Sequence, residues 1–213
     1  MSTPDASTEP SSPLVRVKKA LGRVRRRLQP EVFDVFIKPV LDEHREFEAP
    51  EGYDVRWMTA DEVAACEEYH TELDLAQRED GVRRLGLGHR VVGAFAGDLC
   101  VFSMWENPGK LNVPGLMKRA LAPHQSFIYK AFTSPDHRGR KLYQAGMRFI
   151  LSELQKGGKT ELVGYAHVDK KASRGGMARV GFENVGRVWS LPSPGGRRSV
   201  LSPTLRSNFP PAR

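Results

Sequence analysis

The hexapeptide Arg138-Gly139-Arg140-Lys141-Leu142-Tyr143 is the segment of this sequence best suited to anion chemistry. It stands between an apolar, strand-like run over residues 126–133 and a helix-like segment. Backbone N–H groups that open a helix can converge on a phosphate together with the positive end of the helix dipole. Gly139 lets the backbone approach a ligand, and the three cations can offset its charge. The turn predicts a pyrophosphate-binding loop; the alternative interpretation is a basic surface turn.

The elements that would hold this turn alternate between strand-like and helix-like segments. Thr59-Ala60-Asp61-Glu62 indicates a capping box that opens a helix through about His70, and a second helix is predicted over residues 74–87. Gly97-Asp98 predicts a tight hairpin between two apolar runs. The predicted strands are residues 53–58, 90–96, 99–105, 126–133, 161–168, 187–191 and 199–205.

Two helices are predicted downstream of the turn. The first has an apolar face and ends at Gly157-Gly158, and the second covers about residues 170–180 and stops at Gly181. Residues 107–124 contain Pro and Gly and are predicted to form a loop or lid with a short helix. The apolar face of the first helix consists of Met147, Ile150, Leu151 and Leu154.

The positive charge is concentrated near the N-terminus. The formal net charge is +8, but residues 14–29 hold seven Lys and Arg side chains and no acid, so the remaining chain is nearly neutral. Apolar residues recur in this stretch at steps of three or four, which predicts a basic amphipathic helix that stops at Pro30. Its alternative roles are docking on the domain or a solvated extension, weak contact with an anionic membrane surface, and weak contact with nucleic acid.

The length of 213 residues predicts one domain with tails. The sequence lacks both a run of 18 or more uncharged apolar residues and the apolar region of a secretory signal, so we expect a soluble, cytoplasmic protein. Cys66 and Cys100 have no metal-ligand spacing, which predicts buried free thiols and no metal site. The predicted division is a disordered tail over residues 1–13, a basic helical arm and apolar extension over residues 14–52, the domain over residues 53–205, and a frayed C-terminus over residues 206–213.

The stretch Ser134-Pro135-Asp136-His137-Arg138-Gly139-Arg140 resembles the acyl-CoA pyrophosphate loop of the GNAT acyltransferase superfamily, where a proline and a variable pair precede Arg-Gly. Ala172-Ser173, followed by Gly181-Phe182 and Gly186, looks like the second cofactor-side motif of that family. The opening strand and the hairpin fall in the family's order, so the resemblance covers about residues 53–205. It implies an α/β fold with a central mixed sheet (α+β), two parting strands and flanking helices.

The resemblance also implies an activity. The protein would be an N-acyltransferase that uses acetyl-CoA, or another acyl-CoA, to acylate a primary amine by direct transfer. Acyl-CoA would lie between the parting strands, with its thioester oxygen polarised by backbone N–H groups near Phe132 and Thr133. The cofactor-binding residues that the resemblance assigns are Phe132, Thr133, Ser134, Arg138, Gly139, Arg140, Lys141, Leu142 and Tyr143.

The candidate acid and base groups lie at strand ends and in the two motifs. Glu106 and His124 are candidate general bases beside the predicted cleft, with a solvated surface group as the alternative for each. Tyr143, His167 and Ser173 are the groups expected near the cofactor sulfur, where His167 can equally be a structural histidine.

Four positions depart from the family's pattern. Lys141 and Tyr143 stand where glycine or alanine is usual, Lys170 replaces an asparagine before Ala-Ser, and Met177 replaces a tyrosine that often protonates the thiolate. These departures favour a second interpretation, a GNAT-fold module that binds acyl-CoA with little turnover. A third is an anionic-surface-binding protein that acts through its basic N-terminal helix. The acceptor amine, small molecule or protein, and the oligomeric state stay open.

Overall fold

The structure is a computed structural model that describes residues 29–66, 75–113, 117–194 and 196–209. The predicted tail over residues 1–13 and most of the predicted basic helix therefore lie outside the described residues. Within the described ranges, no helix is both long enough and apolar enough to cross a membrane.

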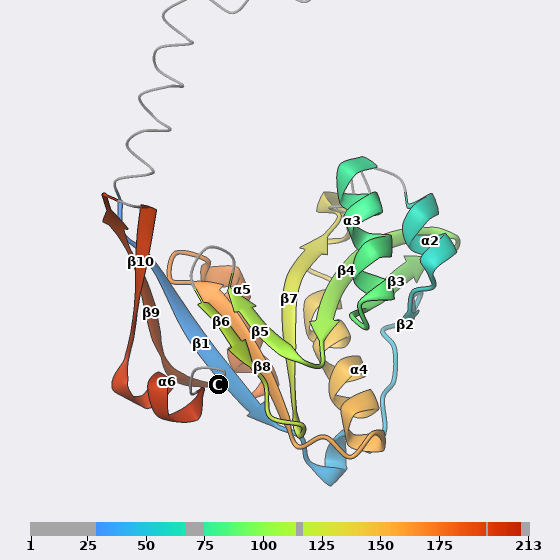
Figure 1. Cartoon of the computed structure of the whole chain (residues 1–213). Coiled ribbons are helices and arrows are strands. Elements are labelled where there is room, and N and C mark those ends of the chain that lie inside the picture. The colour runs from blue at the N-terminus through green and yellow to red at the C-terminus, as the bar shows by residue number, and fades with distance from the viewer. Residues whose placement is uncertain (1–28, 67–74, 114–116, 195, 210–213) are drawn as a thin grey trace, which may run out of the picture.

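An eight-stranded mixed sheet forms the centre of the domain, in the order β10-β9-β1-β8-β7-β4-β3-β2 (Figure 1). A separate hairpin of β5 (Lys110–Val113) and β6 (Met117–Ala120) occupies the segment for which a loop with a short helix was predicted, so that prediction was wrong. The strands of the sheet are β1 (Glu31–Pro39), β2 (Asp54–Trp57), β3 (Arg90–Ala96), β4 (Leu99–Asn107), β7 (Gln125–Thr133), β8 (Glu161–His167), β9 (Glu183–Ser193) and β10 (Gly196–Leu201).

The parallel pair β7 and β8 separates along its length, as Figure 1 shows. The two strands are paired only where residues 125–127 face residues 161–163, and beyond that point β7 stays bonded to β4 alone. The β4–β7 pairing contains a β-bulge, and Lys130 within it adopts a left-handed backbone with φ of 51°. A bulge bends its strand and increases the local twist. The predicted parting strands are thus confirmed, and the bulge lies beside the gap between them.

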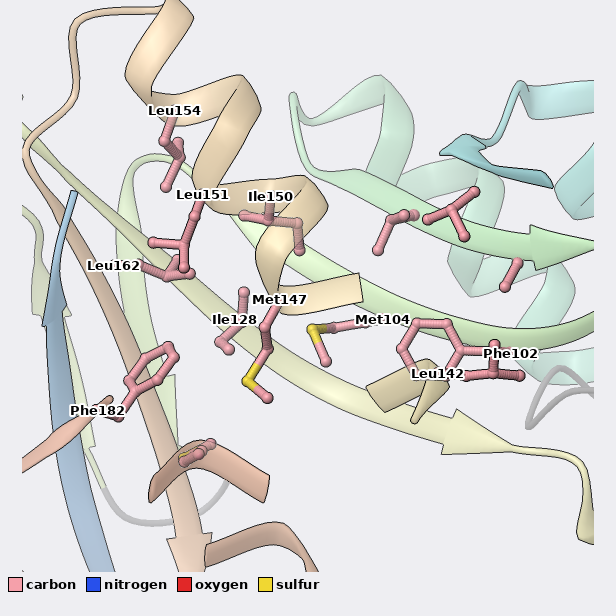
Figure 2. Packing of buried hydrophobic residues seen from close by; sticks show 14 of the residues in the cluster. Phe102, Met104, Ile128, Leu142, Met147, Ile150, Leu151, Leu154, Leu162 and Phe182 are labelled. Carbon is pink, nitrogen blue, oxygen red and sulfur yellow. The ribbon is translucent and has the colours of Figure 1, made fainter. Parts of the chain in front are cut away.

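Helices cover both faces of the sheet. Strand alternation in β4 points Met104 into the core beneath α4 (Leu142–Lys156), whereas Trp105 faces the opposite side and packs with Val63 of α2 (Ala60–Ala65). Figure 2 shows Met104 and Ile128 of the strands meeting Met147 and Ile150 of α4. The predicted capping box of Thr59 opens α2 as expected. The remaining helical elements are α3 (Leu75–Gly86), α5 (Lys171–Val180), α6 (Pro203–Asn208) and the short η1 (Asp42–Arg45) and η2 (Pro135–His137).

The first strand of the described residues, β1, lies inside the sheet. β1 is antiparallel to β8 on one edge, with Phe33 opposite His167, and antiparallel to β9 on the other, with Val32 opposite Trp189. The apolar run that was predicted to extend the core thus forms a strand within the sheet, from Glu31 to Pro39.

The C-terminal end of the domain also differs from the prediction. The strand predicted over residues 199–205 ends at Leu201, because Pro203 occupies the first turn of α6, where a proline needs no N–H partner.

Candidate functional site

The predicted phosphate turn connects β7 to α4 through η2. Gly139 has a φ of 80° and Lys141 a φ of 62°, so two residues on either side of Arg140 are left-handed. Alternating backbone conformations of this kind turn successive N–H groups toward one point. No backbone hydrogen bond within the described part of the chain uses the amide hydrogens of residues 139–144. The turn therefore presents a group of unused donors at the positive end of α4.

A cavity of about 1020 Å³ opens over this turn. All residues from His137 to Ala145 line it, and α5 contributes Ala172, Ser173, Gly176 and Arg179 on the other side. The cations of the turn are exposed, and Arg148 of α4 lines the same cavity. A cavity with unused N–H donors and several guanidinium groups fits a diphosphate.

A second cavity, of about 310 Å³, lies at the gap between β7 and β8. Ala131, Tyr143 and Ser173 line both cavities, so the two adjoin at these residues. The arrangement gives an elongated ligand one route from the turn into the gap.

The edge of β7 that faces the gap carries polar backbone groups that are not directed at β4. Ser134 donates its N–H to the carbonyl oxygen of Val101 at 2.8 Å, and strand alternation then directs the N–H of Thr133 away from β4 and toward the gap. The carbonyl oxygen of Thr133 accepts a hydrogen bond from Arg138 Nε at 3.2 Å, which ties the turn to this strand. Phe132 and Thr133 also line the larger cavity.

Tyr143 and Ser173 are brought together, and His167 lies nearby in the smaller cavity. Tyr143 is partly buried, and this burial raises the pKa of its phenol. Its ring packs on Gly176 of α5 rather than filling the turn, so the side chain at this usual glycine position leaves the larger cavity open. His167 Nδ1 accepts a hydrogen bond from the N–H of Asp169 at 3.2 Å.

The structure places Glu106 and His124 outside both cavities. Glu106 is fully buried and accepts hydrogen bonds from Arg90 Nε, at 2.8 Å, and from the hydroxyl of Ser126. His124 is exposed beside Glu161 at the opposite end of β7 from Thr133. Neither side chain reaches the gap, because the first is held in a closed polar cluster and the second lies at the wrong end of the strand.

One wall of the larger cavity was not predicted from the sequence. The segment from Phe47 to Pro50 lines it, and nothing in its composition marked it as part of a site. Tyr53 was also missed, although its hydroxyl lies 2.9 Å from His137 Nδ1 and so fixes the residue before Arg138. Among the described residues, no group of three or more His, Cys, Asp or Glu side chains is arranged to hold a metal ion.

No protein-family model and no curated protein matches the sequence. Solved structures do match the fold. A putative acetyltransferase of the GNAT family from Novosphingobium aromaticivorans superposes with a TM-score of 0.53 at 16% identity, over 76% of this chain and 63% of that one. A GCN5-related N-acetyltransferase from Sphaerobacter thermophilus gives 0.50 at 13% identity, over 80% and 54%. The chain has the GNAT fold.

A protein from Drosophila matches with a TM-score of 0.53 at 15% identity, over 83% of this chain and 55% of that one. This chain thus spans between 54% and 63% of the length of the three solved structures. At these identities the likeness concerns the GNAT fold itself.

Proposed function

We propose that the protein is an N-acyltransferase that moves an acetyl or other short acyl group from acyl-CoA directly to a primary amine. The main observation behind this proposal is that the cavity over the phosphate turn adjoins the gap between two parting strands. Unused N–H groups of residues 139–144 line a cavity that adjoins, at Tyr143 and Ser173, the gap between β7 and β8.

The residues of the turn suit the diphosphate of acyl-CoA. Its amide hydrogens supply directed donors, and Arg138, Arg140 and Lys141 supply charge. The same residues would hold the pantetheine arm in line with the gap, because Arg138 is bonded to the carbonyl of Thr133. The outward N–H of Thr133 would then donate to the thioester oxygen as negative charge develops on it.

The acceptor nitrogen must be neutral before it attacks. For a lysine-like amine with a pKa near 10.4, deprotonation at pH 7 costs about 4.6 kcal/mol, which follows from a difference of about 3.4 pKa units. Glu106 and His124 lie too far from the gap to remove this proton directly. Three of the candidate acid and base residues predicted from the sequence do line the cavity at the gap: Tyr143, His167 and Ser173. There they can hydrogen-bond the sulfur or relay a proton.

A thermal-shift titration with acetyl-CoA and longer acyl-CoAs tests the binding half of the proposal. A ligand at 100 times its Kd adds about 2.7 kcal/mol to the free energy of unfolding. The double variant Arg140→Ala/Lys141→Ala should lose most of the shift, whereas Arg198→Ala, an exposed cation of β10 outside both cavities, should keep it. Absence of a shift at millimolar acyl-CoA would contradict the proposal.

A panel of primary amines with a thiol assay for released CoA tests the transfer half. Acyl-CoA binding with no amine-dependent release of CoA would favour the second interpretation, a binding module. A biological function that persists without acyl-CoA binding, and disappears when residues 1–29 are removed, would favour an anionic-surface-binding role for the basic segment.

A further inference from the structure

A chain of three polar side chains ends at the gap. Tyr129 of β7 lines the smaller cavity and precedes the bulge at Lys130. Its hydroxyl lies 2.5 Å from Nδ1 of His89, in the connection between α3 and β3, and Nε2 of His89 lies 3.1 Å from the side-chain amide of Asn107. None of these contacts is needed to hold acyl-CoA in the larger cavity, which neither His89 nor Asn107 lines.

The amide of Asn107 has a fixed orientation. Its Oδ1 lies 2.9 Å from the N–H of Gly109 and 3.0 Å from the N–H of Lys110. A backbone N–H can only donate, so the atom that receives both must be the oxygen. The Nδ2 group therefore faces His89, and it can only donate.

This orientation determines where His89 carries its proton. Nε2 must accept from Asn107, so the neutral ring has its hydrogen on Nδ1 and donates to the oxygen of Tyr129. The ring stays neutral because burial, followed by the charges of Arg84 and Arg83, lowers the pKa of His89 more than Glu106 and Asp80 raise it.

The hydroxyl hydrogen of Tyr129 therefore does not point toward His89. Its oxygen already receives the Nδ1–H of His89, and the guanidinium of Arg84 lies over the ring, with Cζ 5.6 Å from the ring centroid. Burial raises the pKa of Tyr129 to about 12, so the phenol keeps its proton at neutral pH. Tyr129 is also one of the residues that line the smaller cavity, where the oxygen of a bound molecule could accept that hydrogen.

We propose that Tyr129 is a fixed hydrogen-bond donor at the gap, directed by Asn107 through His89, and that it selects acceptor amines with an oxygen acceptor beside the reacting nitrogen. The charge of the cavity agrees with this substrate class. Its described lining includes Lys130 and Lys170 and no Asp or Glu, which suits a carbonyl or carboxylate better than a second ammonium group. The selectivity rests on the proposed acyltransferase function, and the direction of the hydrogen bonds does not.

The direction is tested by 15N NMR of the histidine rings at pH 7.5, with the His89 signals assigned by their loss in His89→Gln. The wild-type ring should be neutral with its proton on Nδ1. Asn107→Asp keeps an acceptor for Gly109 and Lys110 but places a second acceptor at Nε2, so the proton should move to Nε2 or the ring should become charged.

Tyr129→Phe is the matched control, because it removes the phenol oxygen and leaves Asn107 in place. The proton of His89 should stay on Nδ1 in this variant. A wild-type proton on Nε2, or a proton that moves in Tyr129→Phe but not in Asn107→Asp, overturns the direction of the chain. A purely structural tie between these residues predicts no such response to Asn107→Asp.

The selectivity is tested with a matched pair of acceptors, phenylalaninamide and 2-phenylethylamine, which differ by one carboxamide. The ratio of their kcat/KM values should fall about tenfold in Tyr129→Phe, as expected for the loss of one hydrogen bond. The different pKa values of the two amines cancel when proteins are compared.

Tyr165→Phe removes another hydroxyl from the same cavity and should keep the wild-type ratio. An unchanged ratio in Tyr129→Phe overturns the selectivity. Acylation of neither amine by any of the proteins overturns the selectivity and counts against the proposed function, while the NMR result decides the donor direction separately.

Discussion

The ring of Tyr143 at the start of α4 lies directly over the Cα of Gly176 in α5. A Cβ at Gly176 would stand 2.5 Å from Cδ1 and 2.6 Å from Cε1 of that ring, closer than real Cβ contacts. One bulky residue in the phosphate turn is thus accommodated by a missing side chain on the neighbouring helix. Both residues line the larger cavity, so this contact forms part of its wall.

Gly176→Ala should therefore lower the free energy of unfolding by about 1–3 kcal/mol, the usual cost of overpacking a close contact. Chemical denaturation measures this change, and calorimetry should show weaker acyl-CoA binding. Gly175→Ala is the matched control, since its Cβ would come no nearer than 3.9 Å to Arg179 and alanine favours a helix by up to about 1 kcal/mol. Equal destabilisation by the two substitutions would count against the packing argument.

Two substitutions of Lys141 separate the effect of its backbone conformation on stability from the effect of its charge on acyl-CoA binding. The φ of 62° at Lys141 costs a non-glycine residue about 1 kcal/mol, and glycine adopts it without strain. We expect Lys141→Gly to exceed Lys141→Ala in unfolding free energy by up to about 1 kcal/mol. The two variants lose the same charge, so they should lose acyl-CoA affinity alike. If Lys141→Ala is as stable as Lys141→Gly, the turn stores no strain at this residue.

We expect removal of the two arginines that pair with Asp34 to destabilise the protein more than removal of the Asp34 charge. Asp34 is fully buried in β1, accepts a hydrogen bond from Arg187 Nε at 2.6 Å, and lies 3.0 Å from Arg174 Nη2 in an ion pair outside hydrogen-bond geometry. Both arginines are partly exposed and can regain water. Replacing both with Ala leaves a buried, unpaired carboxylate and should cost about 3–5 kcal/mol in unfolding free energy.

Asp34→Asn should cost less than the double arginine variant, because it leaves only solvated charges behind. In the Asp34→Asn background the two arginine substitutions should have little further effect, which a double-mutant cycle measures. Additive losses would show that the three charges are not coupled.

His89 predicts a pH dependence of stability. Burial is the first cause of the lowered pKa of His89 in the folded protein. As the pH falls through 6.5, the His89 side chain therefore becomes protonated in the unfolded chain before it does so in the folded protein. The contribution of the neutral ring is present above pH 6.5 and declines as the pH falls from 6.5 toward the lower folded pKa. Urea denaturation between pH 7.5 and 5.5 should show a steeper loss for wild type than for His89→Gln. Parallel curves would contradict this assignment.

Local signals in the sequence predicted most of the sheet and the phosphate turn. Thr59 with Glu62 gave a correct helix start, and Gly97-Asp98 a correct hairpin, because each depends only on residues nearby. The turn at Gly139 was predicted from the adjacent strand and helix patterns in the same way. Of these elements, the turn at Gly139 is the one that lines the larger cavity.

Features that depend on distant contacts could not be predicted. The apolar run in β1 indicated burial but not its place between β8 and β9, which long-range pairing decides. Glu106 looked like an exposed base because nothing local reveals Arg90 and Ser126 closing around it. His89 and Asn107 drew no attention, since their relation to Tyr129 exists only in the folded protein.

The position of β1 between β8 and β9 affects how the sheet can assemble during translation. Among the described strands of this sheet, β1 is synthesised before the others, yet its two neighbours, β8 and β9, are among the last. Until they appear, its backbone N–H and C=O groups lack ladder partners, and such unpaired edges promote association between nascent chains. A translation product that stops before β9 would keep the phosphate turn of a GNAT fold but lose one of the two strands that flank β1. Completion of the sheet around β1 therefore waits until β8 and β9 have both been synthesised.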